Sequence, residues 1–261
     1  MIRLSANLST LFTELPFMER FAAAAASGFT AVECQFPYEA EPQAIAARLR
    51  AAQLEWVLFN GPPGNAGERG IASLPGREHE FDAGIELAAR YVEAGNCRRV
   101  HVMAGLLPSG ADRARHLDTY VAAIGRAADR LAACDATVLI EPINTRVDVP
   151  GYLLDSTALA QACIARAGRP NIRLQFDVYH MQIMQGDLLR SVQRLLPLIG
   201  HIQVADNPGR HEPGSGEIAF ERLLPAIDAM GYAGHVGCEY LPAAGTVAGL
   251  AWARPWLRPH G

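Results

Sequence analysis

One pattern repeats along the whole chain: a short apolar run that ends in a polar residue, then a loop, then a stretch rich in Ala, Leu and Arg. The strand candidates are the runs 3–7, 30–35, 55–60, 99–104, 137–142, 172–177, 201–206 and 235–240. The helix candidates lie near 15–27, 41–53, 79–95, 111–134, 156–167, 187–198, 218–230 and 244–254. Strands that alternate with helical segments predict an α/β protein with a parallel sheet covered by helices.

The number of repeats then selects one architecture. Eight units in a chain of 261 residues match a closed (β/α)₈ barrel, a fold that runs to ~250 residues as one domain. An open, doubly wound sheet is the alternative, but no GxGxxG motif follows the first strand candidate. No linker or low-complexity segment divides the chain. We therefore expect residues 1–261 to form a single TIM-barrel domain.

Two long irregular stretches, 60–78 and 206–217, each follow a strand candidate. In a barrel, both lie at the carboxyl-terminal face, where active sites are built and where long loops usually carry function. The 60–78 loop is rich in Gly and Pro and carries Arg69 and Arg77. These features predict a lid that brings positive charge to an anionic ligand.

Composition excludes several function classes. All 23 basic residues are arginine, which excludes a Schiff-base aldolase, a pyridoxal-phosphate enzyme and a P-loop NTPase, because each needs a lysine. A net charge of −4 with scattered basic residues predicts no nucleic-acid or membrane partner. The five widely spaced cysteines indicate free thiols, and neither a signal peptide nor an apolar run of ~18 residues is present. We expect a cytoplasmic protein, and a homo-oligomer is compatible with the sequence.

Acidic or amide side chains stand in or at the end of each of the last four strand candidates: Glu141, Asp177, Gln203 and Glu239. A carboxylate that follows a buried strand is costly unless it is paired or bound to a cation. Each alone could be a helix cap or an ion-pair partner. Together, at equivalent positions, they predict an all-oxygen site for a divalent cation, which favours Mg²⁺ or Mn²⁺ over Zn²⁺.

Further polar residues could also face the carboxyl-terminal mouth of the barrel: Asn7, Glu33, Asn60, His101, Asn144, His180, Asp206 and Arg210. His180 is well placed, three residues beyond Asp177, and the same positional argument applies to His101. Arg69, Arg77 and Arg210 lie in the long loops, and a guanidinium is the group that a substrate carboxylate requires. The alternative for each arginine is a solvated loop residue.

These motifs resemble a known superfamily. The eight units, the Glu/Asp/Gln/Glu set and the DxxH at 177–180 resemble the xylose-isomerase-like barrels. Within that superfamily the chain is similar to the hydroxypyruvate isomerase family, which includes the closely similar 2-oxo-tetronate isomerases. The segments that carry this similarity are 67–81, 139–154, 175–182, 203–218 and 237–240, and the resemblance covers nearly the whole chain.

The resemblance implies roles for particular residues. Glu141 and Glu239 match a pair of glutamates that donate and accept a proton on opposite sides of the substrate. The same two residues, with Asp177 and Gln203, match the metal ligands. His180 and Arg210 match positions that contact substrate oxygens in related ketose epimerases, and those epimerases carry a histidine where this chain has Gln203. The position-based candidates Asn7, His101 and Arg69 complete the expected substrate-binding set.

The expected chemistry is the isomerisation of a small anionic substrate, a 2-oxo or hydroxy acid, through an enediolate. A cation and hydrogen-bond donors stabilise the enediolate charge, and two carboxylates move the proton, so no organic cofactor is needed. Hydroxypyruvate converted to tartronate semialdehyde is the first choice, and 2-oxo-tetronate is the alternative. A ketose 3-epimerase, a metal-dependent nuclease and a non-catalytic sensor stay open, although Gln203 disfavours the first and the net charge disfavours the second.

Overall fold

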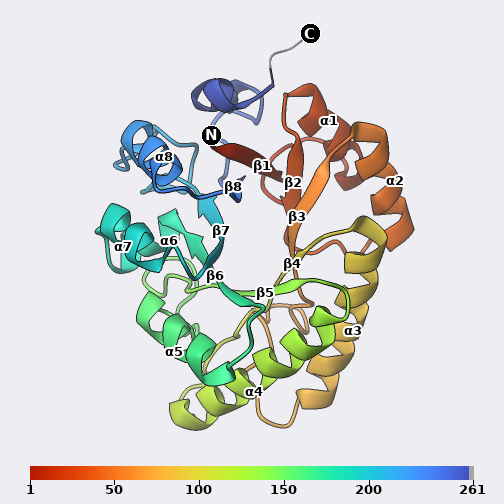
Figure 1. Ribbon diagram of the computed structural model, residues 1–261, viewed down its shortest axis with the longest axis vertical. Coiled ribbons are helices and arrows are strands. Elements are labelled where there is room, and N and C mark those ends of the chain that lie inside the picture. The colour runs from red at the N-terminus through yellow and green to blue at the C-terminus, as the bar shows by residue number, and fades with distance from the viewer. Residues whose placement is uncertain (259–261) are drawn as a thin grey trace.

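A computed structural model describes residues 1–258 and shows a closed barrel of parallel strands surrounded by helices (Figure 1). Each strand pairs with its sequence neighbours, and β1 pairs with β8 to close the barrel. The strands are β1 (Arg3–Asn7), β2 (Ala31–Cys34), β3 (Glu55–Asn60), β4 (Arg99–His101), β5 (Thr137–Ile140), β6 (Ile172–Asp177), β7 (Ile199–Val204) and β8 (His235–Cys238). The predicted single (β/α)₈ barrel is confirmed, and residues 259–261 of the expected domain lie outside the described residues.

The helices pack their apolar faces against the outside of the barrel. They are α1 (Arg20–Ala26), α2 (Pro42–Ala52), α3 (Glu78–Gly95), α4 (Arg113–Ala132), α5 (Thr157–Ala167), α6 (Val178–Met184), α7 (Leu188–Leu195) and α8 (Phe220–Ala229), with 3₁₀ segments η1 (Phe17–Glu19) and η2 (Ala248–Trp256). In α4, Asp112 caps the first turn by accepting from the Ala114 N–H, and Tyr120, Ile124 and Leu131 are fully buried. Burial of such a side chain contributes ~1.5–3 kcal/mol, so packing holds this layer in place.

Five strands end earlier than predicted. β2 ends at Cys34, β4 at His101, β5 at Ile140, β7 at Val204 and β8 at Cys238. Glu141 and Glu239 therefore lie just beyond their strands. They occupy the first residues of the loops at the carboxyl-terminal face, where the fold builds its sites.

Two helical segments differ from the expectation. α6 begins immediately after β6, and the sequence pattern did not predict it, because its apolar residues continue the apolar character of the strand. The segment predicted as a helix near 244–254 forms the 3₁₀ segment η2 instead. Gly249 lowers helix propensity there, and Pro255 has no N–H to donate to an α-helical hydrogen bond.

The back half of the 60–78 loop is anchored to the loop after β4. The Ser73 N–H donates to the Ala104 carbonyl at 3.1 Å, and within the loop itself the Gly70 N–H donates to the Pro63 carbonyl at 2.9 Å. Gly70 has φ +104°, and a Cβ there would lie 2.4 Å from the Met103 carbonyl oxygen, so only glycine fits. The part of the loop that fits the lid expectation is therefore its exposed tip, residues 65–67.

Arg77 does not match its predicted role. Its guanidinium is held by Glu68 and Glu80 and ties the loop to the start of α3. The expectation that Arg77 carries charge to a ligand is corrected on this ground.

Among residues 1–258, none of the helices combines the length and the apolar content that crossing a lipid bilayer requires.

Candidate active site

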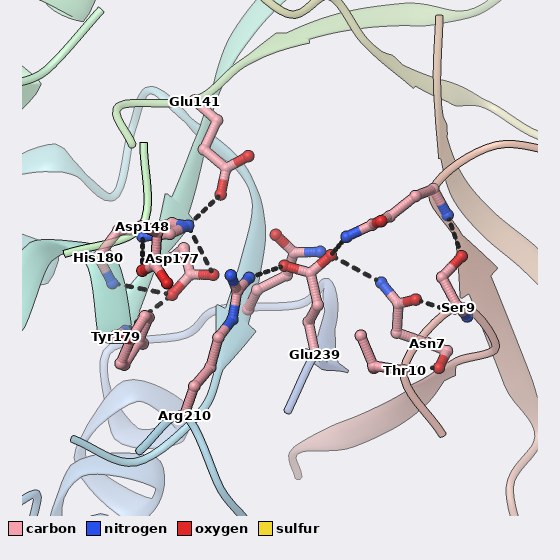
Figure 2. Close-up of polar contacts among 12 residues, drawn as sticks. Asn7, Ser9, Thr10, Glu141, Asp148, Asp177, Tyr179, His180, Arg210 and Glu239 are labelled. Atoms are coloured by element: carbon pink, nitrogen blue, oxygen red, sulfur yellow. Dashed lines mark hydrogen bonds and ion pairs between the residues drawn. The ribbon is translucent and has the colours of Figure 1, made fainter. Parts of the chain in front are cut away.

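A small polar cavity of about 80 Å³ opens at the carboxyl ends of the strands. The residues predicted for the site that line it are Arg69, His101, Glu141, His180, Arg210 and Glu239. Asp177, Gln203 and Asn7 are buried beside them. Asn7 donates to Glu239 and to Glu33, Gln203 donates to Glu33, and Asp177 accepts from the His180 N–H. Figure 2 shows Asp177 and Asn7 on opposite sides of Glu239. The structure therefore brings the nine predicted site residues to one end of the barrel.

Asp177 ends β6 and caps α6 at the same time. Its Oδ1 accepts from the Tyr179 N–H at 2.7 Å and from the His180 N–H at 3.2 Å. Its Oδ2 is buried and has no hydrogen-bond partner among the described residues. The cap explains one oxygen of this carboxylate, while the other oxygen stays available to a ligand. Burial raises the pKa of Asp177, although Arg210 and the two N–H donors counteract this.

Glu141 follows β5 and is buried with little compensation. Its Oε1 has no hydrogen-bond partner among residues 1–258, and the nearest cationic candidates are distant, with His101 Nδ1 3.5 Å from Oε2 and His180 Nε2 3.9 Å from Oε1. Burial raises the pKa of Glu141 well above its usual range, and the charges of Asp177 and Glu239 raise it further. Without a cation, this carboxyl group holds a proton readily.

Glu239 follows β8 and lies among donors. Its Oε1 accepts from Asn7 Nδ2 and from Gln35 Nε2, each at 3.0 Å, and its Oε2 accepts from Arg210 Nη2 at 2.8 Å. Figure 2 shows Glu239 between Arg210 on one side and Asn7 on the other. Burial raises the pKa of Glu239 and Arg210 lowers it, so the ionised form is better supported here than at Glu141.

The 206–217 loop positions Arg210. The buried Asp206 side chain accepts from the N–H groups of Gly214 at 2.8 Å, Gly216 at 2.9 Å and Ile218 at 3.0 Å, so the loop folds around one carboxylate. Arg210 itself has φ +56°, an uncommon conformation for a residue with a side chain. Its guanidinium carbon lies 5.3 Å from the centre of the Tyr179 ring, which supports it from the side opposite Glu239.

The two histidines of the site are neutral. Burial lowers the pKa of His101 to about 3, with a further contribution from His180. Burial and then Arg210 lower the pKa of His180 to about 3. Neutral imidazoles near pH 7 act as hydrogen-bond partners, each with one donor and one acceptor nitrogen.

A further buried carboxylate, Glu33 on β2, lies beneath this site. It accepts from Ser5 Oγ at 2.8 Å, Asn7 Nδ2 at 3.2 Å, His201 Nε2 at 2.8 Å and Gln203 Nε2 at 2.8 Å. We call these five residues the Glu33 cluster. Burial alone would raise the pKa of Glu33, but the charge and hydrogen bond of His201, with the bonds from Gln203 and Ser5, outweigh burial and lower it.

Gly237 on β8 makes room for this cluster. A Cβ at Gly237 would lie 2.4 Å from both carboxylate oxygens of Glu33. The cluster connects to the mouth at two places, because Asn7 Nδ2 also reaches Glu239 and Gln203 Oε1 accepts from Gln175 Nε2 at 2.5 Å. Glu33 therefore orients the amides that contact the site.

The sequence-based prediction missed Gln35 and Gln175, which both line the cavity. The strand period gave a usable signal for Gln175, because residues 175 and 177 lie on the same face of β6. Gln35 follows β2 and is the polar residue that closes its strand candidate, as in the other repeats. Arg69 lies exposed at the rim of the cavity, and its guanidinium makes no ion pair or hydrogen bond within residues 1–258.

Three side chains lie close enough together to hold a divalent cation, and they share only Glu141 and Asp177 with the predicted set. Glu141, Asp177 and His180 each offer one atom, and these atoms lie within 4.8 Å of one another. Two buried carboxylate oxygens, Glu141 Oε1 and Asp177 Oδ2, have no donor in the described part of the chain. Gln203 Oε1 and Glu239 Oε2 each accept one hydrogen bond and keep a second lone pair. Such oxygens are the ligands that hard cations prefer.

Comparisons with known proteins agree with this geometry. The family described as "Xylose isomerase-like TIM barrel" matches residues 21–256. The chain is 50% identical over 259 residues to 2-oxo-tetronate isomerase of Cupriavidus necator, covering 98% of this chain and 99% of that protein. It is 46% identical over 268 residues to the putative hydroxypyruvate isomerase of Homo sapiens, covering 100% and 97%. It is also 43% identical over 258 residues to hydroxypyruvate isomerase of Escherichia coli, covering 98% and 100%.

Solved structures share the whole architecture. An AP endonuclease, family 2, from Brucella melitensis superposes with a TM-score of 0.96 at 44% identity, covering 99% of this chain and 100% of that chain. An L-ribulose 3-epimerase superposes with a TM-score of 0.75 at 22% identity, covering 99% and 88%. The second similarity is one of fold alone.

Proposed function

Since the chain belongs to the xylose isomerase-like TIM barrel family and is an isomerase, we propose that it interconverts a small 2-oxo or hydroxy acid through an enediolate. The observation that carries this proposal is the placement of two buried glutamates, Glu141 and Glu239, on one cavity of about 80 Å³. A three-carbon acid suits so small a cavity, so hydroxypyruvate converted to tartronate semialdehyde is the first choice.

The two glutamates would move the proton. Glu239 accepts three hydrogen bonds, which favour its carboxylate form, so we assign it as the base. It takes a proton from C3 of hydroxypyruvate, which leaves an enediolate across C2 and C3. Glu141 returns a proton to C2, and the hydroxyl proton moves from O3 to O2, so the aldehyde forms at C3. A positioned acid or base of this kind contributes ~10²–10⁴-fold to the rate.

A divalent cation, Mg²⁺ or Mn²⁺, is part of the proposal. Glu141, Asp177, Gln203 and Glu239 would hold it, and the unpartnered oxygens of Glu141 and Asp177 are the observation in its favour. When bound, such a cation supplies Lewis-acid stabilisation of the enediolate oxygens. No organic cofactor enters the proposed reaction.

Arg69 supports an acid rather than a neutral ketose as substrate. Arg210 is engaged by Glu239, whereas the Arg69 guanidinium lies at the rim of the cavity without an ion pair in the described residues. A guanidinium binds a carboxylate through two parallel hydrogen bonds. We therefore propose that Arg69 binds the substrate carboxylate. In Arg69→Ala, KM for the acid should rise ~10-fold or more, because a charge-assisted hydrogen bond contributes ~1.5–3 kcal/mol.

A second substrate is favoured by the comparison at 50% identity with a 2-oxo-tetronate isomerase. A four-carbon acid would use the same glutamates and would differ only in the length that the cavity must accept. The deciding experiment is an assay of the pure protein on hydroxypyruvate and on 2-oxo-tetronate, with Mg²⁺, with Mn²⁺ and with chelator. Turnover of hydroxypyruvate with the higher kcat/KM supports the first choice, and the reverse ratio selects the alternative. Absence of turnover on both acids contradicts the proposal.

A further inference from the structure

Asn144 lies in the loop after β5, three residues beyond Glu141, and its side chain is fully buried. Its orientation is set by the backbone. Oδ1 accepts from the Val147 N–H and from the Asp148 N–H, both at 3.0 Å. Because both of these partners are donors, the oxygen of the amide must face them, and Nδ2 must face the opposite side.

The two N–H bonds of Asn144 Nδ2 are both assigned. One donates to Asp148 Oδ2, and the other reaches His180 Nδ1 at 2.7 Å. An amide nitrogen has no acceptor capacity, so His180 Nδ1 must accept. The Asp148 carboxylate is no competing partner, since its Oδ2 lies 3.8 Å from His180 Nδ1, beyond hydrogen-bond distance. Because Nδ1 accepts, it carries no hydrogen, and the ring carries its hydrogen on Nε2.

The Nε2–H group of His180 lies at the site and has no acceptor at bonding distance among residues 1–258. Nε2 lies 3.9 Å from Glu141 Oε1 and 4.0 Å from Asp177 Oδ2, too far for a direct hydrogen bond to either. His180 lines the cavity together with Glu141, on the side where Figure 2 places Asp177. A donor that is aimed into a cavity and lacks a partner suits a substrate oxygen that gains negative charge.

We infer that Asn144 is a positioning residue that fixes His180 in the Nε2–H tautomer, so that this neutral imidazole donates a hydrogen bond to an enediolate oxygen. The inference rests on the proposed function for the identity of that oxygen. It also separates His180 from the metal ligands. Although Nε2 lies near Glu141 and Asp177, a nitrogen that carries hydrogen has no lone pair for a cation.

Asn144→Asp is the test, because it replaces the donor at Nδ2 by an acceptor and keeps the side-chain shape. His180 should then place its hydrogen on Nδ1 and lose the Nε2–H donor. We expect the ¹⁵N spectrum to show the Nε2–H pattern for His180 in the wild type and the Nδ1–H pattern in the variant. The ring is assigned by comparison with His180→Gln. We also expect kcat to fall about 10²–10³-fold, as for loss of one oxyanion donor, with a much smaller change in KM.

Asn171→Asp is the matched control, since Asn171 Nδ2 donates to the Ala128 and Ala136 carbonyls, remote from the site. It should leave the His180 tautomer and kcat unchanged. An Nδ1–H pattern in the wild-type protein overturns the inference even if no variant folds, and so does an Asn144→Asp protein with wild-type kcat. The wild-type spectrum is recorded without substrate. An Nε2–H tautomer in a protein that does not turn over either acid would therefore leave the positioning role standing and reject the proposed function.

Discussion

The barrel contains two groups of buried carboxylates that differ in how their charge is compensated. In the Glu33 cluster, four side-chain donors surround one carboxylate. At the mouth, Glu141 Oε1 and Asp177 Oδ2 are equally buried but have no donor among residues 1–258. Burial imposes a similar desolvation cost in both places, so the difference lies in the hydrogen bonds.

The contrast separates Glu33, a structural carboxylate, from Glu141 and Asp177 at the mouth, whereas Glu239 has donors of its own. The pKa of Glu33 is lowered, since His201 and the other donors outweigh burial, whereas burial raises the pKa of Glu141 and of Asp177. An uncompensated buried carboxylate needs a proton, a cation or a ligand, and this need is what a reaction can use. The two groups share the amide side chains of Asn7 and Gln203. The Glu33 cluster therefore also orients side chains at the mouth.

The largest expected effect is on turnover. Glu141→Gln and Glu239→Gln keep side-chain size and one oxygen but remove the proton-carrying group, so each should lose ~10²–10⁴-fold in kcat. With Glu239 as the base, Glu239→Gln should fail to exchange the C3 proton of hydroxypyruvate with deuterium. Glu141→Gln should still exchange it while forming little product. The double variant should be little worse than the worse single variant, because the pair acts as a unit.

Glu86→Gln is the control for these variants, because Glu86 pairs with Arg130 on the surface. It should keep wild-type turnover. Near-full activity in either active-site variant would contradict the two-glutamate mechanism. Exchange retained in Glu239→Gln and lost in Glu141→Gln would reverse the assignment of base and acid.

The next largest effect is on the free energy of unfolding, and it should appear in the Glu33 cluster. Glu33→Gln leaves two of the four buried donors facing an NH₂ group, and removal of one partner from a buried charge network costs ~3–5 kcal/mol. Glu141→Gln removes an uncompensated charge and should leave the free energy of unfolding equal or higher. Urea denaturation of both variants in chelator, beside Glu86→Gln, measures this difference. Equal destabilisation by Glu33→Gln and Glu141→Gln would remove the distinction between the two groups.

Metal affinity should depend on the carboxylates at the barrel mouth and not on surface carboxylates. Asp177→Asn keeps an oxygen that can cap α6 but removes the charge of a predicted ligand. Mn²⁺ affinity, measured by calorimetry, should fall by more than the ~10–100-fold that outer-sphere partners contribute. Asp206→Asn offers no clean control because it would disturb the Arg210 loop, so the surface variant Asp129→Asn serves instead. Unchanged Mn²⁺ affinity in Asp177→Asn would rule out the metal assignment.

The smallest effects are on the pH dependence of stability in chelator. Glu33 has a folded pKa below its unfolded value of ~4.3, so its contribution is present above that pH and is lost as pH falls through the folded pKa. Glu141 has a raised pKa, so ionisation of Glu141 destabilises the folded protein progressively as pH rises from ~4.3 through its folded pKa. The wild type should therefore lose stability relative to Glu33→Gln on acidification, and relative to Glu141→Gln as pH rises. Each slope is at most ~1.4 kcal/mol per pH unit, and slopes of the same sign would contradict the assignment.

The sequence predicted the fold well because the repeat is a local signal. Alternating apolar runs and helical stretches require only nearby residues, and the polar strand ends follow from the same pattern. The helix α6 escaped prediction because Asp177 acts as a strand end and a cap at once, with an apolar segment on either side. Short segments of this kind leave periodicity ambiguous.

The Glu33 cluster could not be assembled from the sequence. Glu33 is joined to Ser5, His201 and Gln203 across separations of 28, 168 and 170 residues. Which of these side chains meet inside the barrel depends on strand register and stagger, and no single strand encodes either. The role of Asn144 is hidden for a similar reason, since it depends on which way an amide points.

Gly237 links two positions that lie far apart in the chain. Because a Cβ there would lie 2.4 Å from both Glu33 oxygens, a side chain at 237 is compatible only with a smaller residue at 33. The effect of a substitution at position 237 therefore depends on the residue at position 33, so the two positions are epistatic. In a library randomised at both positions, functional clones should pair glycine with glutamate, and single replacements at 237 should be purged. Directed evolution of this barrel would have to change both positions together.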